Sequence, residues 1–200
     1  MPGEELHEAG ADGARRAKEW LEATTRVKAA WTNTDPMWKR RMTFKWPSGK
    51  KTPFSLDLGG ILCGGEFDNA YFMAECKKYS APRDQGTAYL SYLAKCYVIM
   101  SQQPGAVDHF MWITWSPFNV TDWDKLLTGE WVRQGVEKHG EDIFGEYAPS
   151  ELGALIDSEV VASVTERLWM IVLSDKQEKL VITRQHRALI QKYDVLEGVR

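Results

Sequence analysis

Glu75 and Lys77 are the residues whose types and spacing suggest chemistry most directly. They follow the apolar run YFMA and enclose Cys76. In an extended strand, side chains alternate between the two faces, so the carboxylate and the ammonium project from one face and Cys76 from the other. Such a pair is either an exposed ion pair of small stabilising effect or part of a reactive site. The apolar run before it favours the second interpretation.

A second carboxylate, Asp57, lies on the preceding predicted strand. Residues 52–62 and 70–79 read as two strands, and the Gly and Asn residues between them predict the turn of a β-hairpin. The hairpin would bring Asp57 and Glu75 face to face, beside the backbone carbonyl of Cys76. Oxygen donors of this kind suit Mg²⁺, which takes one or two protein carboxylates and keeps several waters. We therefore expect Asp57, Glu75 and Cys76 to hold Mg²⁺, with Mn²⁺ able to substitute.

Asp68 is an alternative to Asp57 as the first acid. It falls within the predicted turn, only a few residues before Glu75. A residue in the turn itself is less suited to face a strand residue across the hairpin. We therefore prefer Asp57.

This arrangement of two acids and a lysine predicts hydrolysis of a phosphodiester bond. A bound divalent metal can lower the pKa of a water molecule, orient it, and neutralise charge on a phosphate. Lys77, on the same face as Glu75, would offset the additional negative charge of the transition state. The expected catalytic residues on these strands are Asp57, Glu75 and Lys77.

The next predicted element, a helix over residues 85–103, adds two polar side chains. Gln85 and Tyr89 are four residues apart and so share one face of the helix. Pro104 and Gly105 are typical of a helix end. Gln85 and Tyr89 therefore join the candidate catalytic residues.

The order of these motifs resembles the PD-(D/E)xK superfamily of restriction-endonuclease-like nucleases. In that family, a helix is followed by a β-hairpin bearing the Asp and the Glu-x-Lys, then by a second helix and another strand. Gln85 and Tyr89 are similar to the Q-x-x-x-Y motif of its RecB-like branch, in which the pair lies beside the metal and contacts nucleic acid. The resemblance covers about residues 10–118. It implies an α/β fold with a three-layer αβα core and a mixed central sheet.

Two positions depart from the family pattern or leave it open. Leu56 stands where the name-giving Pro would precede the first acid. The family's first helix often supplies one more acid to the metal, and four residues of this chain compete for that role. They are Glu8, Asp12, Glu19 and Glu22.

The composition is that of a globular protein rather than of a membrane or disulfide-rich one. The chain has 200 residues, a formal net charge of −3, three Cys and nine Trp. No apolar run approaches the roughly 18 residues of a membrane span, and the acidic N-terminus lacks a signal-peptide core. The odd Cys count without CxxC spacing argues against disulfides and zinc. We expect a cytoplasmic protein of one domain, residues 1–200, whose nuclease-like core spans about 10–118.

Basic and acidic residues are unevenly distributed along the chain. Residues 37–51 contain six basic residues and no acidic one, interleaved with Trp38, Phe44 and Trp46, whereas residues 119–165 are strongly acidic. Such a distribution orients a polyanion, and the basic segment leads into the strand of Asp57. The alternative is a solvated basic loop. The expected nucleic-acid-binding residues are Lys39, Arg40, Arg41, Lys45, Lys50, Lys51 and Lys78.

Hydrophobic periodicity predicts the remaining elements. A first amphipathic helix is expected over residues 14–31 and a strand over 108–116. The C-terminal extension, about residues 119–200, is expected to pack on the core as helices and a hairpin. Its helices are predicted over 121–139, 150–165 and 184–193, and its hairpin over 167–182, turning at 174–177.

The sequence therefore predicts an Mg²⁺-dependent deoxyribonuclease with DNA as its partner, possible association with another protein or a second copy, and no membrane contact. The alternative is a catalytically silent nuclease fold that binds DNA or serves as a scaffold in a larger complex. A domain that binds small molecules or proteins, unrelated to nucleic acid, would require the basic segment and the motif order to be coincidental.

Overall fold

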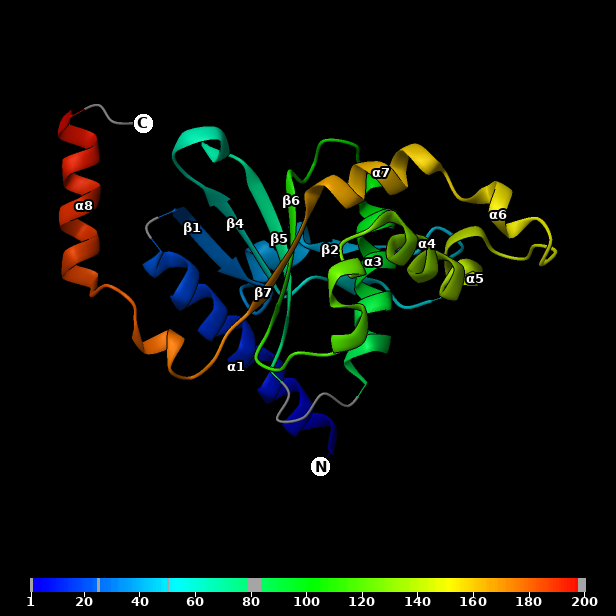
Figure 1. Cartoon of the computed structure of the whole chain (residues 1–200), viewed down its shortest axis with the longest axis horizontal. Helices are drawn as coiled ribbons and strands as arrows, with labels where there is room; N and C mark the ends of the chain where they lie inside the picture. The colour runs from blue at the N-terminus through cyan, green and yellow to red at the C-terminus, as the bar shows by residue number, and fades with distance from the viewer. Residues whose placement is uncertain (1, 25, 50, 79–83, 198–200) are drawn as a thin grey trace.

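The protein is an α/β structure built on a five-stranded mixed sheet with helices packed against it (Figure 1). The computed structural model describes residues 2–24, 26–49, 51–78 and 84–197. The strands of the main sheet are β1 (Val27–Thr32), β4 (Leu58–Leu62), β5 (Tyr71–Lys77), β6 (His109–Thr114) and β7 (Leu168–Val172). The α-helices are α1 (Pro2–Ala23), α2 (Pro36–Arg41), α3 (Gln85–Gln102), α4 (Gly129–Lys138), α5 (Gly140–Phe144), α6 (Leu152–Leu155), α7 (Ser158–Arg167) and α8 (Arg184–Glu197).

The main sheet has the order β1-β4-β5-β6-β7. β4 pairs antiparallel with both β1 and β5, whereas β5, β6 and β7 run parallel. Helix α3 makes the connection from β5 to β6, as a parallel pair requires a long crossover. Because β5 and β6 are covered on both faces, they are nearly continuous apolar runs.

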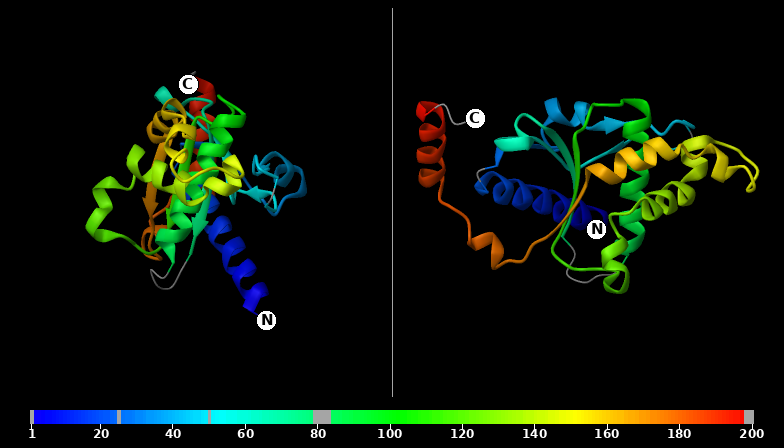
Figure 2. Two further views of the ribbon diagram at one scale, coloured as in Figure 1. Left: turned by 90° about the vertical axis from the view of Figure 1, so that its right-hand side faces the viewer. Right: turned by 45° about the horizontal axis from the view of Figure 1, so that its top comes forward.

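Each face of the sheet has its own buried cluster. Helix α1 covers one face, where it packs on β1 and β5. Helix α3 covers the other face, with α4 and α7 packed on α3 (Figure 2). Since α3 lies between the sheet and two further helices, it is apolar on most sides and largely buried. The faces are called the α1 face and the α3 face below.

A small hairpin lies on the α3 face beside the main sheet. It consists of β2 (Thr43–Phe44) and β3 (Phe54–Ser55). Its aromatic residues, together with Trp46, join the buried cluster of the α3 face. Helix α2, capped by Asp35 through the Met37 amide, precedes it. The segment from α2 to β3 therefore interrupts the path between β1 and β4.

The structure confirms the predicted hairpin and the helix after it, and corrects three other predictions. The first helix ends at Ala23, and residues 27–32 form strand β1 instead of continuing it. The region 52–62 is two strands with a break before Leu58. The second hairpin over 167–182 is wrong, because β7 joins β6 in the main sheet and a short 3-10 helix, Gln177–Lys179, follows it.

The C-terminal helices differ from prediction mainly in their bounds. Residues 120–125 are a 3-10 segment before α4, and α6 and α7 share the region predicted as one helix. Helix α8 forms as predicted and lies beyond the β1 end of the sheet in Figure 1, where Arg187 contacts Glu22 of α1 and the carbonyl oxygen of Val27. None of the described helices is long and apolar enough to cross a membrane.

The edge strand β1 is irregular where it pairs with β4. The register of β1 with β4 shifts between Val27 and Ala29, which marks a bulge at Lys28. The Lys28 side chain is exposed.

Candidate active site

The β4–β5 pair brings Asp57 and Glu75 together. Asp57 lies directly before β4, and its backbone N–H donates to the carbonyl oxygen of Ala74, 2.9 Å away. The backbone N–H of Cys76 donates to Asp57 Oδ2, also at 2.9 Å. These two bonds fix the position of the Asp57 carboxylate beside the strand that carries Glu75. The predicted convergence of the two acids is therefore present.

Strand alternation separates the three residues of the Glu-x-Lys motif as expected. The Cys76 side chain is buried in the cluster of the α1 face. Glu75 and Lys77 project to the α3 face, where Glu75 is only 4% exposed. Lys77 Nζ lies 2.8 Å from Glu75 Oε1. Glu75 is therefore buried at the sheet, and Lys77 is half-buried beside it.

A second lysine, Lys95 of α3, also contacts Glu75. Its Nζ lies 3.2 Å from Oε1 and 3.3 Å from Oε2. Burial alone would raise the pKa of the Glu75 carboxyl, but the charges of Lys95 and Lys77 outweigh it and hold the pKa below its ordinary value. Glu75 is therefore ionised at neutral pH and shared by two cations.

Asp57 is in the opposite electrostatic situation. Burial, followed by the negative charge of Glu75, raises the pKa of the Asp57 carboxyl to about 6. Lys77 and the Cys76 amide only partly compensate. Asn33 adds a long contact of 3.4 Å to Oδ1. A further cation near Asp57 would favour the ionised form of its carboxyl group.

The oxygen donors at this site suit a magnesium ion, although they are few. Two carboxylates and the backbone carbonyl of Cys76 are hard oxygen donors, and Mg²⁺ commonly keeps waters in its other positions. No group of three or more His, Cys, Asp or Glu side chains suited to a metal occurs among the described residues. A metal at Asp57 and Glu75 would have to share Glu75 with Lys77 and Lys95.

Gln85 lies close to this site through β6. Thr114 is the register partner of Lys77 on the neighbouring strand, and its Oγ1 donates to Gln85 Oε1 at 2.9 Å. Gln85 is fully buried, and its Nε2 has no hydrogen-bond partner in the part of the chain that the structure describes. A buried amide nitrogen of this kind is a donor available to a ligand or a water molecule.

Tyr89 takes a different position from the one expected of it. Its side chain is fully buried, and its hydroxyl donates to the carbonyl of Leu126 at 2.6 Å. Burial raises the pKa of Tyr89 well above its ordinary value. Its ring packs against Tyr92 and Trp112. Tyr89 therefore supports the core behind the site, and no hydrogen bond joins it to the two acids among the described residues.

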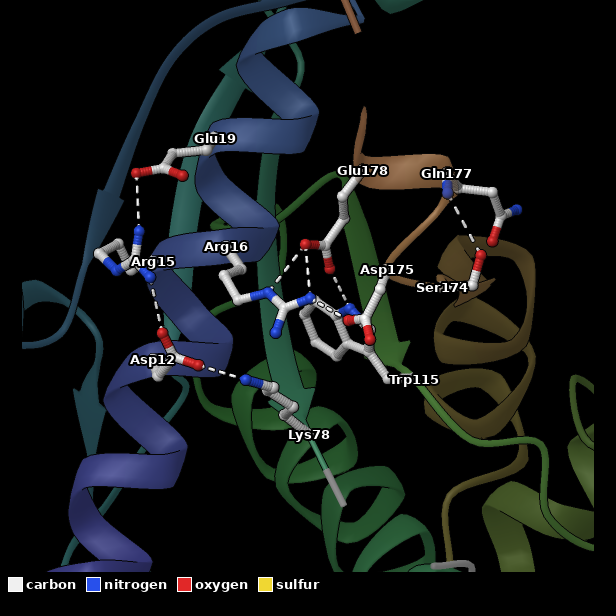
Figure 3. Close-up of polar contacts among 10 residues, drawn as sticks. All are labelled: Asp12, Arg15, Arg16, Glu19, Lys78, Trp115, Ser174, Asp175, Gln177 and Glu178. Carbon is white, nitrogen blue, oxygen red and sulfur yellow. Dashed lines mark hydrogen bonds and ion pairs between the residues drawn. The ribbon is translucent and has the colours of Figure 1, made fainter. Parts of the chain in front are cut away.

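Of the acids proposed from the first helix, Asp12 comes nearest to the end of β5. Asp12 Oδ2 lies 2.5 Å from Lys78 Nζ, and its other oxygen pairs with Arg15 (Figure 3). Hydrogen bonds from Lys78 and then Arg15 lower the pKa of Asp12. Glu19 also pairs with Arg15. Asp12 therefore lies on the α1 face, across the sheet from Glu75.

No contact among the described residues places Glu22 or Glu8 at the site. Glu22 pairs with Lys18 and, from α8, with Arg187. The side chain of Glu8 lies outside the described residues. Asp68 is held within its turn, where Oδ1 accepts the N–H of Gly64. The preference for Asp57 over Asp68 is thus consistent with the geometry.

The α1 face near Lys78 carries a second ionic cluster. Arg16 pairs with Asp175 and Glu178, which follow β7, and Trp115 donates its indole N–H to Glu178 (Figure 3). Arg16 is itself mostly buried. This cluster fixes the chain after β7 to helix α1.

The predicted basic surface is present only in part. Lys39, Arg40, Arg41 and Lys45 are exposed. Lys51 pairs with Asp142 at 2.8 Å and lies over the ring of Trp46. Lys50 lies outside the described residues, and Lys78 is paired with Asp12.

Two of the three aromatic residues interleaved with the basic segment are buried and so are not available to stack on bases. Phe44 and Trp46 are at most 5% exposed and belong to the buried cluster of the α3 face. Trp38 is half-buried. Of these three residues, Trp38 has the most exposed side chain.

Lys95 is the site residue that sequence reasoning missed. It is the only charged residue in α3, whose other members are apolar or neutral. A single charge in a helix buried on most sides requires a partner, and that was the available signal.

Comparisons with known protein families, with curated proteins and with solved structures find no match for this chain.

Proposed function

We propose that the protein is a metal-dependent nuclease of the restriction-endonuclease-like type, acting on phosphodiester bonds in DNA. The observation that carries this proposal is the placement of Asp57, Glu75 and Lys77 on one face of an antiparallel strand pair. The parallel strand β6 and the crossover helix α3 follow in the order that the resemblance implies.

In this proposal, Asp57, Glu75 and the carbonyl of Cys76 would hold Mg²⁺. When bound, the metal supplies Lewis-acid stabilisation of the phosphate and activation of a water molecule. Lys77 holds its ammonium within reach of Glu75 and so beside the reacting phosphate, where it offsets developing negative charge. Gln85 offers its buried Nε2 as a donor that orients a phosphate oxygen or a water.

The test is cleavage of supercoiled plasmid, linear duplex and single-stranded DNA by wild type and Lys77→Ala, each with Mg²⁺, Mn²⁺ or EDTA. Metal-dependent cleavage by wild type and a loss of at least about a hundredfold in the variant are expected. Lys179→Ala, at an exposed lysine in the 3-10 helix after β7 and outside the proposed site, is the matched control and should cleave as wild type does. Folded wild-type protein that leaves every substrate intact with both metals would overturn the proposal.

A second candidate function is a silent nuclease fold that binds DNA as part of a larger complex. The observation that favours it is Lys95, which contacts both oxygens of Glu75 and so competes with a metal for that ligand. Salt-dependent DNA binding that is unaffected by EDTA and by Lys77→Ala, with no cleavage, would support this candidate over the first.

A further inference from the structure

A cavity lies on the α3 face, at the start of β5, on the same face of the sheet as the two acids. Its volume is about 300 Å³, near the lower end for ligand pockets and suited to one ring system. Its walls come from β1, α2, β5 and the end of α3. The lining residues used below are Trp31, Trp38, Arg41, Tyr71, Met73 and Gln103.

Two stacked indoles form one wall of this cavity. The ring centroids of Trp31 and Trp38 are 3.8 Å apart, with an angle of 15° between the planes. No ring fits between them, so a ligand stacks on an outer face of the pair. Because one indole comes from β1 and the other from α2, the flat surface is held by two elements rather than by one mobile loop. Such a surface is preorganised for a planar ring.

The positive charge at the cavity indicates which class of planar ligand it would bind. The guanidinium of Arg41 lies over Trp38, 5.2 Å from the ring centroid. The cation–π interaction that this indole can make is therefore provided by the protein itself. Arg41 has no carboxylate within ion-pair distance among the residues that the structure describes. The neighbouring Lys39 and Arg40 are exposed. A neutral ring that carries an anionic group satisfies both features, whereas a cationic ligand would meet Arg41.

The cavity and the acids share one strand. Tyr71, Met73, Glu75 and Lys77 alternate along β5 on the α3 face, and the first two line the cavity. Two residues of a strand span about 7 Å, so the cavity begins about that distance from Glu75. A base held there would have its phosphate near the proposed metal.

We infer that this cavity receives one unpaired nucleobase of a DNA strand whose adjacent phosphate lies at Asp57 and Glu75. The inference rests on the proposed function and narrows its substrate to single-stranded DNA or frayed ends. The base stacks on the outer face of the indole pair and displaces the guanidinium of Arg41 from Trp38 to the adjacent phosphate, while Gln103 supplies hydrogen bonds to the base edge. The cavity does not accept a base that is still paired, because the partner base would have to enter the same small volume.

Binding of a fluorescent single-stranded oligonucleotide in EDTA tests the inference without cleavage. Trp38→Ala should weaken binding about tenfold to a hundredfold, and Trp38→Phe by less, because stacking on an aromatic ring is partly kept. Arg41→Ala, at an exposed position, is the second variant and should weaken binding even if Trp38→Ala folds poorly. Trp123→Ala, which removes an indole that is 41% exposed elsewhere, is the matched control and should bind as wild type does.

The outcomes separate this inference from the proposed function. If both cavity variants stay folded and bind the oligonucleotide as wild type does, the cavity assignment is wrong, while cleavage that depends on Lys77 can still stand. If wild type cleaves nothing but the cavity variants lose binding, the nuclease proposal fails and the base site remains. Equal affinity for dAMP and the oligonucleotide would overturn the assignment to a strand.

Discussion

The carboxyl group of Asp57 lies where its negative charge opposes folding. Its pKa rises from an ordinary value of 3.8 to about 6, owing to burial and then to Glu75. Between these two pH values the folded chain binds more protons than the unfolded chain. The free energy of unfolding in metal-free buffer should therefore fall as the pH rises from about 4 to about 6.

Asp57→Asn should remove this pH dependence. The amide oxygen can still accept the Cys76 N–H, so the variant should be more stable than wild type at pH 7, by about 2–3 kcal/mol. Urea denaturation between pH 4 and 8 in EDTA measures both effects. Asp124→Asn, at an exposed position, is the control that should leave the wild-type slope intact. A variant with the same slope as wild type would contradict the placement of Asp57.

Lys95 should both stabilise the fold and weaken metal binding at Glu75. Lys95→Met leaves the buried Glu75 with Lys77 alone, so we expect the free energy of unfolding to fall by about 2 kcal/mol. Mn²⁺ should then raise the melting temperature of the variant more than that of wild type, because the metal replaces the missing cation.

Thermal denaturation with and without Mn²⁺ measures this difference, with Lys138→Met on exposed helix surface as the control. An equal response of Lys95→Met and wild type to Mn²⁺ would place the metal away from Glu75.

At the scale of elements, the position of β4 between β1 and β5 depends on Gly60. A Cβ there would lie 2.6 Å from the carbonyl oxygen of Ala29 on β1 and 2.6 Å from ring carbons of Phe72 on β5. Gly60→Ala must therefore push strands apart. We expect a loss of about 2–3 kcal/mol in the free energy of unfolding.

Gly153→Ala is the matched control for this substitution. It lies in α6, where an added Cβ meets nothing within 4 Å. Its stability should equal or slightly exceed that of wild type, as expected for Ala in a helix. Chemical denaturation compares the two variants, and equal stability of both would show that β4 tolerates displacement.

The elements that sequence alone predicts are those set by local pattern. The hairpin that joins Asp57 to Glu75 is such a case, because its turn residues and apolar strands are contiguous. Strand β1 is not set by local pattern, because residues 27–32 form a strand by pairing with β4, about thirty residues later. The same holds for β7, whose parallel partner β6 lies beyond four helices.

The candidate site divides in the same way. The convergence of Asp57, Glu75 and Lys77 was predictable from strand alternation. The contact of Lys95 with Glu75 was not, since it depends on how α3 crosses the sheet. Tyr89 shares a helix face with Gln85, yet its hydroxyl reaches Leu126 in a neighbouring segment. Helical spacing indicates which residues lie on one side of a helix, not what that side meets.

For the whole molecule, the exposed basic residues near α2 should determine how DNA binding responds to salt. Lys39, Arg40 and Lys45 line one shallow depression on the surface. If each contacts a phosphate, the triple substitution to Ala should reduce the slope of log affinity against log salt by about two for single-stranded DNA. Titrations at several salt concentrations in EDTA measure the slope.

A control triple variant carries Ala at three exposed lysines at the other end of the chain, Lys176, Lys179 and Lys192. It changes the net charge by the same amount without altering the surface near α2. Its slope should match that of wild type. Equal slopes for the two triple variants would show that overall charge, and not this surface, governs binding.

The irregular edge at β1 also affects how copies of the protein meet one another. A regular edge strand offers an even row of N–H and C=O groups on which another chain can add a strand, and this is a route to aggregation. The bulge at Lys28 interrupts the regular spacing of β1, and the exposed Lys28 side chain contacts Asn69 in the turn between β4 and β5. Sheet extension through β1 would bury a lysine and leave backbone groups mismatched. A bulge and an exposed lysine on an edge strand are features that disfavour edge-to-edge pairing of sheets, and we expect them to act in this way at β1.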